Sequence, residues 1–133
     1  MKKYLLDTCI CVFLFRDKYG VRERLNSLRR EDCYISEVTV AELKYGIENS
    51  GRWRQEHEKL DKFLSMINIV PFCDSIDRYA KEKSRLRKEG SLIDDFDLLI
   101  GCAALARDLV LVTDNGKHFS RIVGLKMENW IRR

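Results

Sequence analysis

The sequence predicts one α/β domain over residues 1–133, with a mostly parallel central sheet of four to five strands and helices on both faces. Short apolar runs alternate along the chain with longer segments of helical periodicity. Each run is bounded by polar residues, as in strands that are buried inside a parallel sheet. The length of 133 residues suits a single core, and no internal repeat or linker divides it.

The N-terminal part predicts one strand and then two helices. Residues 3–6 form the first strand, because the apolar run stops at the carboxylate of Asp7. Residues 9–17 carry apolar side chains at helical spacing, and Thr8 is a candidate N-cap. After a glycine, residues 21–30 predict a second amphipathic helix.

The middle of the chain predicts two strands that alternate with two helices. Residues 33–36 form a short apolar run that ends in the hydroxyl of Ser36, which is a candidate cap for a helix over residues 37–48. A long charged helix follows over residues 52–66. The third strand, residues 67–70, stops at the only proline.

The C-terminal part predicts two more helices and two strands. Asp74 or Ser75 caps a helix to about residue 88, and the acidic segment at residues 93–97 opens the next one. The second helix, a fourth strand and a last short strand are expected over residues 93–107, 109–112 and about 125–127.

Composition excludes several classes of protein. No apolar run approaches the roughly 20 residues that span a bilayer, and the basic start is too short for a signal peptide. Five cysteines without a C-x-x-C pair argue against a disulfide framework or a zinc site, so we expect a reducing cytoplasm. No glycine-rich phosphate loop and no serine-nucleophile motif is present.

The net charge of +4 is mild, yet the basic residues cluster. Each cluster alone is explained as a solvated helix face. Together, around an acidic cleft, they would suit a polyanion. The clusters are Arg22, Arg24, Arg29 and Arg30; Arg52, Arg54, Lys59 and Lys62; and Lys81, Lys83, Arg85, Arg87 and Lys88.

Two acids stand out in the first half of the chain. Asp7 ends the first strand, at the sheet edge where open α/β folds bind ligands, although it could simply cap the next helix. Glu42 falls within a stripe formed with Val38, Ala41 and Tyr45 at helical spacing, on a helix that we expect to be buried on most sides. A carboxylate that faces a core needs a metal or a basic partner, for which Arg22 or Lys44 is available.

Further acids follow in the second half. Asp94, Asp95 and Asp97 open a nearly apolar helix; capping explains some of them, but three exceed what a cap needs. Asp114 and Asn115 end the fourth strand, where an Asn-Gly turn is the simpler interpretation. Gathered carboxylates repel one another, and Mg²⁺ removes that cost because it prefers oxygen ligands. Such a site could activate water against a phosphodiester.

Several ordered blocks resemble the PIN-domain family, and within it the VapC-type toxins of toxin–antitoxin pairs. The resemblance covers nearly the whole chain and is carried by residues 5–8, 36–46, 94–101, 111–119 and 124–130. It implies an endoribonuclease toxin that hydrolyses RNA with water activated by carboxylate-bound Mg²⁺, with Mn²⁺ as a substitute.

The resemblance also assigns site residues and partners. Asp7, Glu42 and Asp97 match the acidic core of the family, as catalytic residues and metal ligands. Asn115 stands where the wider family often has Asp, and Asp114 where a basic or neutral residue is usual; both are weaker candidates, and Asp94 could substitute. RNA, a cognate antitoxin and a second copy in a homodimer are the implied partners, with no membrane. A non-catalytic RNA- or protein-binding module is the alternative.

Overall fold

A five-stranded parallel sheet forms the centre of the computed structural model, which describes residues 1–133. The strand order is β3-β2-β1-β4-β5, and every neighbouring pair is parallel. This confirms the predicted fold class. The strands are β1 (Tyr4–Leu6), β2 (Cys33–Ser36), β3 (Asn68–Val70), β4 (Val110–Val112) and β5 (Met127–Glu128).

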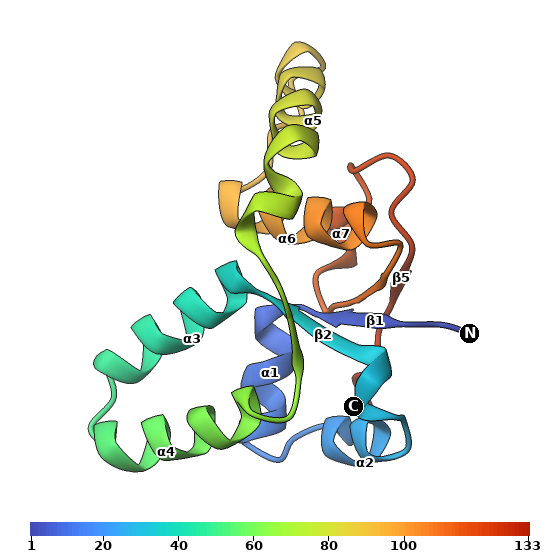
Figure 1. Ribbon diagram of the computed structural model, residues 1–133. Helices are drawn as coiled ribbons and strands as arrows, with labels where there is room; N and C mark the ends of the chain where they lie inside the picture. Colours follow the sequence, from blue (N-terminus) through green and yellow to red (C-terminus); the bar gives the residue numbers. More distant parts are fainter.

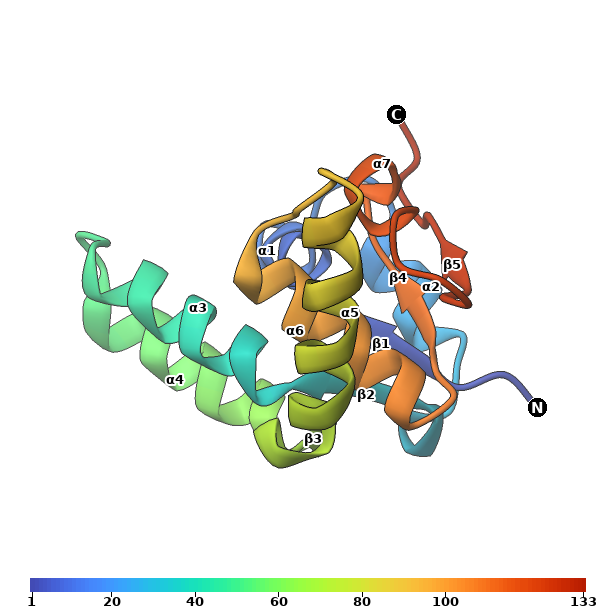
Figure 2. The same ribbon diagram turned by 90° about the horizontal axis from the view of Figure 1, so that it is seen from above.

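Helices cover both faces of this sheet (Figures 1 and 2). One core joins the sheet to the first four helices, and a second core joins its other face to the last three. The helices are α1 (Thr8–Phe15), α2 (Val21–Asn26), α3 (Glu37–Glu48), α4 (Trp53–Leu64), α5 (Ile76–Lys88), α6 (Asp95–Ala106) and α7 (Gly116–Phe119), with 3₁₀ turns η1 (Arg30–Asp32) and η2 (Phe72–Ser75).

The position of the central strands explains why their sequences are continuous apolar runs. In β1, Tyr4 and Leu6 pack into the first core, whereas Leu5 packs into the second. In β4, Val110 and Leu111 divide between the two cores in the same way. Successive side chains of a strand point to opposite faces, so a sheet that is covered on both sides buries all of them.

Helices α3 and α4 form an antiparallel pair that projects from the body of the molecule (Figures 1 and 2). Ser36 caps α3 as predicted, because its hydroxyl accepts a hydrogen bond from the amide of Thr39 at 3.2 Å. Leu43 and Ile47 face the first core. The predicted stripe around Glu42, on a helix buried on most sides, is wrong: Val38 is buried, but Ala41 is exposed and Tyr45 is 71% exposed.

Some local predictions need correction. Asp7, not Thr8, is the N-cap of α1: its side chain accepts the amide of Thr8, which is the first helical residue. The second helix stops at Asn26 rather than at residue 30, and η1 follows it. The short helix α7 was not predicted at all.

The strand order places a crossover point at the centre of the sheet. From β1 the chain moves to β2 and β3 on one side, and it later returns to β4 on the other. Ligands in open α/β sheets bind where the order reverses, outside the carboxyl ends of the strands. Asp7 follows β1 and Thr113 follows β4, and the amide of Asp7 donates to the carbonyl of Val112 at 2.9 Å. The fold therefore brings these two strand ends together.

Candidate metal centre

Asp7 is a rigidly held carboxylate. Its Oδ1 accepts the amide of Thr8 at 2.8 Å, and its Oδ2 accepts the hydroxyl of Thr113 at 2.8 Å and the thiol of Cys9 at 3.5 Å. The residue is 5% exposed. Burial raises the pKa of Asp7, although the hydrogen bonds from Thr113 and Thr8 partly offset this. Asp7 thus caps a helix and also faces the crossover point, so the two interpretations of the sequence are compatible.

Glu42 has a hydroxyl partner in place of a basic one. The hydroxyl of Thr8 donates to Oε1 of Glu42 at 2.7 Å and lies 3.0 Å from the hydroxyl of Thr39. Neither Arg22 nor Lys44 pairs with Glu42, as the salt bridges of the chain show. Thr8 therefore connects the two acids, because its amide binds Asp7 and its hydroxyl binds Glu42. The sequence did not lead us to predict this role of Thr8. The signal that was available is a hydroxyl residue directly after the acid that ends the first strand.

The N-terminus of α6 supplies the other two acids. Asp94 is the N-cap, and its Oδ2 accepts the amide of Phe96 at 3.1 Å. Asp97 lies in the first turn, half-buried, with the imidazole Nδ1 of His118 4.0 Å from its Oδ2. Burial, followed by the charges of Asp7, Asp94 and Glu42, raises the pKa of Asp97 to about 6. His118, from α7, was not predicted to approach the site.

The acids form one repulsive group. Burial raises the pKa of Glu42, and the charges of Asp7 and Asp94 raise it further, against the hydrogen bond from Thr8. No lysine or arginine forms an ion pair with Asp7, Glu42 or Asp97, and the imidazole 4.0 Å from Asp97 is the one basic group close to them. A group of mutually repelling carboxylates without basic partners is stabilised when a cation binds among them.

The remaining acidic candidates lie apart from this group. Asp95 pairs with the ammonium of Lys83 and accepts the hydroxyl of Tyr79, both at 2.8 Å. Asp114 is neutralised by Arg133 at 2.7 Å and accepts the amide of Asn129 at 3.0 Å. These partners lower the pKa of Asp114. The side-chain amide of Asn115 is 3.0 Å from Nδ1 of His118, and its backbone amide donates to the hydroxyl of Thr113 at 2.9 Å, so Asn115 reaches the group through neighbours of Asp97 and Asp7.

The donor atoms fit a hard divalent cation. Carboxylate and hydroxyl oxygens surround the site, and burial raises the pKa of the nearby Cys9 thiol to about 11, so the thiol stays protonated. No group of three or more Asp, Glu, His or Cys side chains is close enough together to hold an ion directly. Mg²⁺ suits this spacing, because it usually takes one or two carboxylates and keeps several waters.

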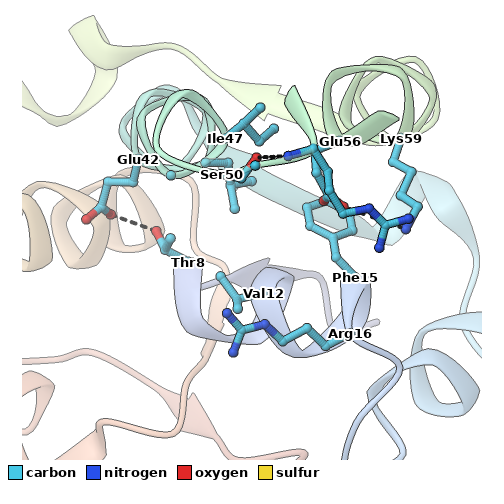
Figure 3. Close-up of a pocket in the computed structure, with 13 residues that line it drawn as sticks. Thr8, Val12, Phe15, Arg16, Glu42, Ile47, Ser50, Glu56 and Lys59 are labelled. Atoms are coloured by element: carbon cyan, nitrogen blue, oxygen red, sulfur yellow. Dashed lines mark hydrogen bonds and ion pairs between the residues drawn. The ribbon is translucent and has the colours of Figure 1, made fainter. Parts of the chain in front are cut away.

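A groove of about 580 Å³ adjoins the centre between α1 and the α3–α4 pair. In Figure 3, Thr8 and Glu42 lie at one end of this groove and Lys59 lies toward the other, with Val12 and Phe15 between them. Glu42 is the one carboxylate of the group that lines this groove. No helix of the chain combines the length and the apolar character that a membrane span requires.

Comparison with known proteins identifies relatives of this chain. The PIN domain family profile matches residues 4–125. A protein named Ribonuclease VapC2 from Rickettsia felis is 39% identical over 131 residues, which cover 96% of this chain and 97% of that protein. A protein named tRNA(fMet)-specific endonuclease VapC from Shigella flexneri is 34% identical over 132 residues, covering 98% and 99%.

Solved structures share the fold over its full length. The VapBC2 complex of Rickettsia felis bound to a promoter DNA fragment contains a chain with a TM-score of 0.87 and 36% identity, covering 96% of this chain and 98% of that one. In the DNA-bound VapBC of Salmonella typhimurium the TM-score is 0.90 at 30% identity, with 98% and 99% covered.

Proposed function

The chain belongs to the PIN-domain family, and we propose that it is a metal-dependent endoribonuclease that acts as the toxin of a toxin–antitoxin pair. The observation that carries the proposal is the group of repelling carboxylates at the crossover point, where Asp7 is buried, Asp97 and Glu42 are half-buried, and Glu42 lines the adjoining groove. Full-length relatives named as VapC ribonucleases support the same activity.

Each acid has a distinct part in this proposal. Asp7 is the fixed ligand, because three donors hold its carboxylate in one orientation. Asp97 and Glu42 complete the set from α6 and α3, and Asp94 is the fourth carboxylate in reach. Bound Mg²⁺ or Mn²⁺ would lower the pKa of a water and neutralise charge on the attacked phosphodiester. Thr8 keeps Asp7 and Glu42 in register with each other.

The weaker candidates receive other roles. We assign Asp114 to the folded structure, because Arg133 already neutralises it. Asn115 orients His118 beside Asp97 and could accept a water. Hydrolysis in line with the scissile bond should leave a 5′-phosphate and a 3′-hydroxyl on the RNA.

We further propose RNA as substrate and a protein antitoxin as partner. Relatives form VapBC complexes, and the Shigella flexneri relative is named for cleavage of tRNA(fMet), so transfer RNA is the first substrate to test. Five free cysteines suit a reducing cytoplasm. The homodimer implied by the resemblance stays a prediction.

Cleavage of purified cellular RNA by the purified protein tests the function. We expect cleavage with Mg²⁺ or Mn²⁺, none with EDTA, and loss of at least about a hundredfold in Asp7→Asn and Asp97→Asn. Asp95→Asn is the matched control, because Asp95 lies in the same helical turn as Asp97 but pairs with Lys83. Undiminished cleavage by Asp97→Asn would refute the proposal. RNA binding without cleavage in every metal would favour the non-catalytic module.

A further inference from the structure

The groove beside the acids is lined by three basic side chains, two of which have no carboxylate partner, and by the acids Glu42 and Glu56. Arg16, the C-cap of α1, forms no ion pair or hydrogen bond through its side chain. Arg52, the N-cap of α4, donates only to the amide oxygen of Gln55, at 3.0 Å. Lys59 has its nearest acid, Glu56, at 3.9 Å. These three exposed cations are available to an anion from outside the chain.

Six of the other twelve arginines of the chain form ion pairs with acids. Arg85 binds Glu82 at 2.8 Å and Glu89 at 3.0 Å, and Arg107 binds Asp74 at 2.6 Å. Such pairs stabilise the surface of the fold and leave little charge for a ligand. Arg16 and Arg52 have no ion pair, and they differ from the other unpaired arginines because they line one groove together with Thr8 and Glu42.

The walls of the groove run directly from the acids to the cations. On α1 the lining residues Thr8, Val12 and Arg16 are four residues apart, so they lie on one face of the helix. On the opposite wall Glu42 and Gly46 have the same spacing along α3. Eight residues of helix span about 12 Å, so the cations lie within a few nucleotides of the metal centre.

Gly46 leaves the α3 wall open. A β-carbon added there would meet no atom within 4 Å, so packing inside the chain does not require glycine at this position. Glycine within a helix costs about 0.5–1 kcal/mol relative to alanine. Glycine is the usual residue where a ligand approaches the backbone closely. Glycine at this position leaves room for an occupant along α3.

We propose that this groove holds single-stranded RNA on one side of the cleaved bond, with Arg16, Arg52 and Lys59 contacting its phosphates. The inference rests on the proposed function. A positively charged groove that tracks the backbone is the usual means of binding a single strand without reading its sequence. An RNA strand is favoured over an acidic protein segment because the groove starts at Glu42 and Thr8, where the chain to be cut must lie.

Two charge-matched triple variants test the groove. The first combines Arg16→Gln, Arg52→Gln and Lys59→Gln; the control combines Lys81→Gln, Arg87→Gln and Lys88→Gln on α5, which does not line the groove. Both are made in an Asp97→Asn chain. Binding of a fluorescein-labelled single-stranded 12-nucleotide RNA is measured with Mg²⁺ at several salt concentrations, and thermal melting verifies folding.

We expect the groove variant to bind about tenfold or more weakly, with the slope of log K against log salt flatter by about 0.7 for each lost phosphate contact. The control should bind like its parent. Gly46→Phe, which keeps every charge, should also weaken binding because its ring fills the groove. If the groove variant misfolds, the comparison of Gly46→Phe with its parent remains as the test.

Three results would overturn the inference. Equal weakening in both triple variants would mean that only net charge matters. Unchanged binding in the groove variant and in Gly46→Phe would exclude the groove. Tighter binding of a labelled decaglutamate peptide than of RNA, lost in the groove variant, would assign it to an acidic protein segment. Failure of the proposed function is separable, because it appears as absent Mg²⁺-dependent cleavage by the unaltered chain.

Discussion

Replacing Asp97 by asparagine should stabilise the metal-free protein while it abolishes cleavage. Burial, together with the charges of Asp7, Asp94 and Glu42, raises the pKa of Asp97 to about 6, so ionisation of this carboxylate costs free energy in the folded state. Asparagine keeps the shape of the side chain and removes its charge. The stability of the fold and the affinity for metal should therefore change in opposite directions.

The size of the expected stabilisation follows from the pKa of Asp97 and from the exposure of its side chain. The rise from 3.8 to about 6 corresponds to at most about 3 kcal/mol. The side chain of Asp97 is 24% exposed, and the lost attraction to the N-terminus of α6 is worth about 0.3–1 kcal/mol. We therefore expect a net gain of about 1–2 kcal/mol at neutral pH.

The sign of the pH dependence is fixed by the raised pKa. A carboxylate whose folded pKa exceeds its unfolded pKa contributes stability below the unfolded value, near 3.8, and this contribution is lost as the pH rises through about 6. The difference between Asp97→Asn and the unaltered chain should therefore be small near pH 4 and full near pH 7.

Thermal melting in EDTA across this pH range is the assay, repeated with millimolar Mg²⁺. Mg²⁺ should raise the melting temperature of the unaltered chain and not that of the variant, because a ligand stabilises only the state that binds it. Asp95→Asn, which breaks the pair with Lys83, should not melt above the unaltered chain in EDTA and should still be stabilised by Mg²⁺. If Asp97→Asn melts below the unaltered chain at pH 7 in EDTA, the carboxylates do not repel as inferred.

Other positions give sharp expectations. Thr113→Val removes a donor to Asp7 and should raise the Mg²⁺ concentration needed for cleavage by about 10–100-fold; an unchanged Mg²⁺ titration would contradict the positioning role. A methyl group on Gly101 would overlap Cδ1 of Ile122, so Gly101→Ala should cost about 1–3 kcal/mol in urea unfolding. Adding Ile122→Val should recover part of this loss, and no recovery would mean that the overlap is not the cause. Gly46→Ala should add about 0.5–1 kcal/mol in the same assay, and a loss would show a packing role that the open space around it does not indicate.

The sheet and most of the acidic centre could be predicted because local patterns carry them. Continuous apolar runs identified the strands, and a carboxylate directly after β1 identified Asp7. Ser36 and Asp94 cap α3 and α6 as their residue types suggested. Each of these features depends on residues that are close in sequence.

The predictions that failed involve contacts between residues that are distant in sequence. The charge of Asp114 is cancelled by Arg133, and nothing near Asp114 in the sequence indicates this. Helical spacing alone suggested that Tyr45 is buried with Glu42, but α3 projects past the body, so its outer side meets solvent. The hydroxyl of Thr113 reaches Asp7 across 106 positions of chain, which only the strand order explains.

The crossover at β1 and β4 also sets when the centre can exist. During synthesis Asp7 leaves the ribosome first, whereas Asp97 and the supporting Thr113 emerge only about 90 and 106 residues later. No nascent fragment that lacks α6 and β4 contains the assembled acids. The translating ribosome, with its own RNA close by, is therefore not exposed to the assembled acids until α6 and β4 have been made.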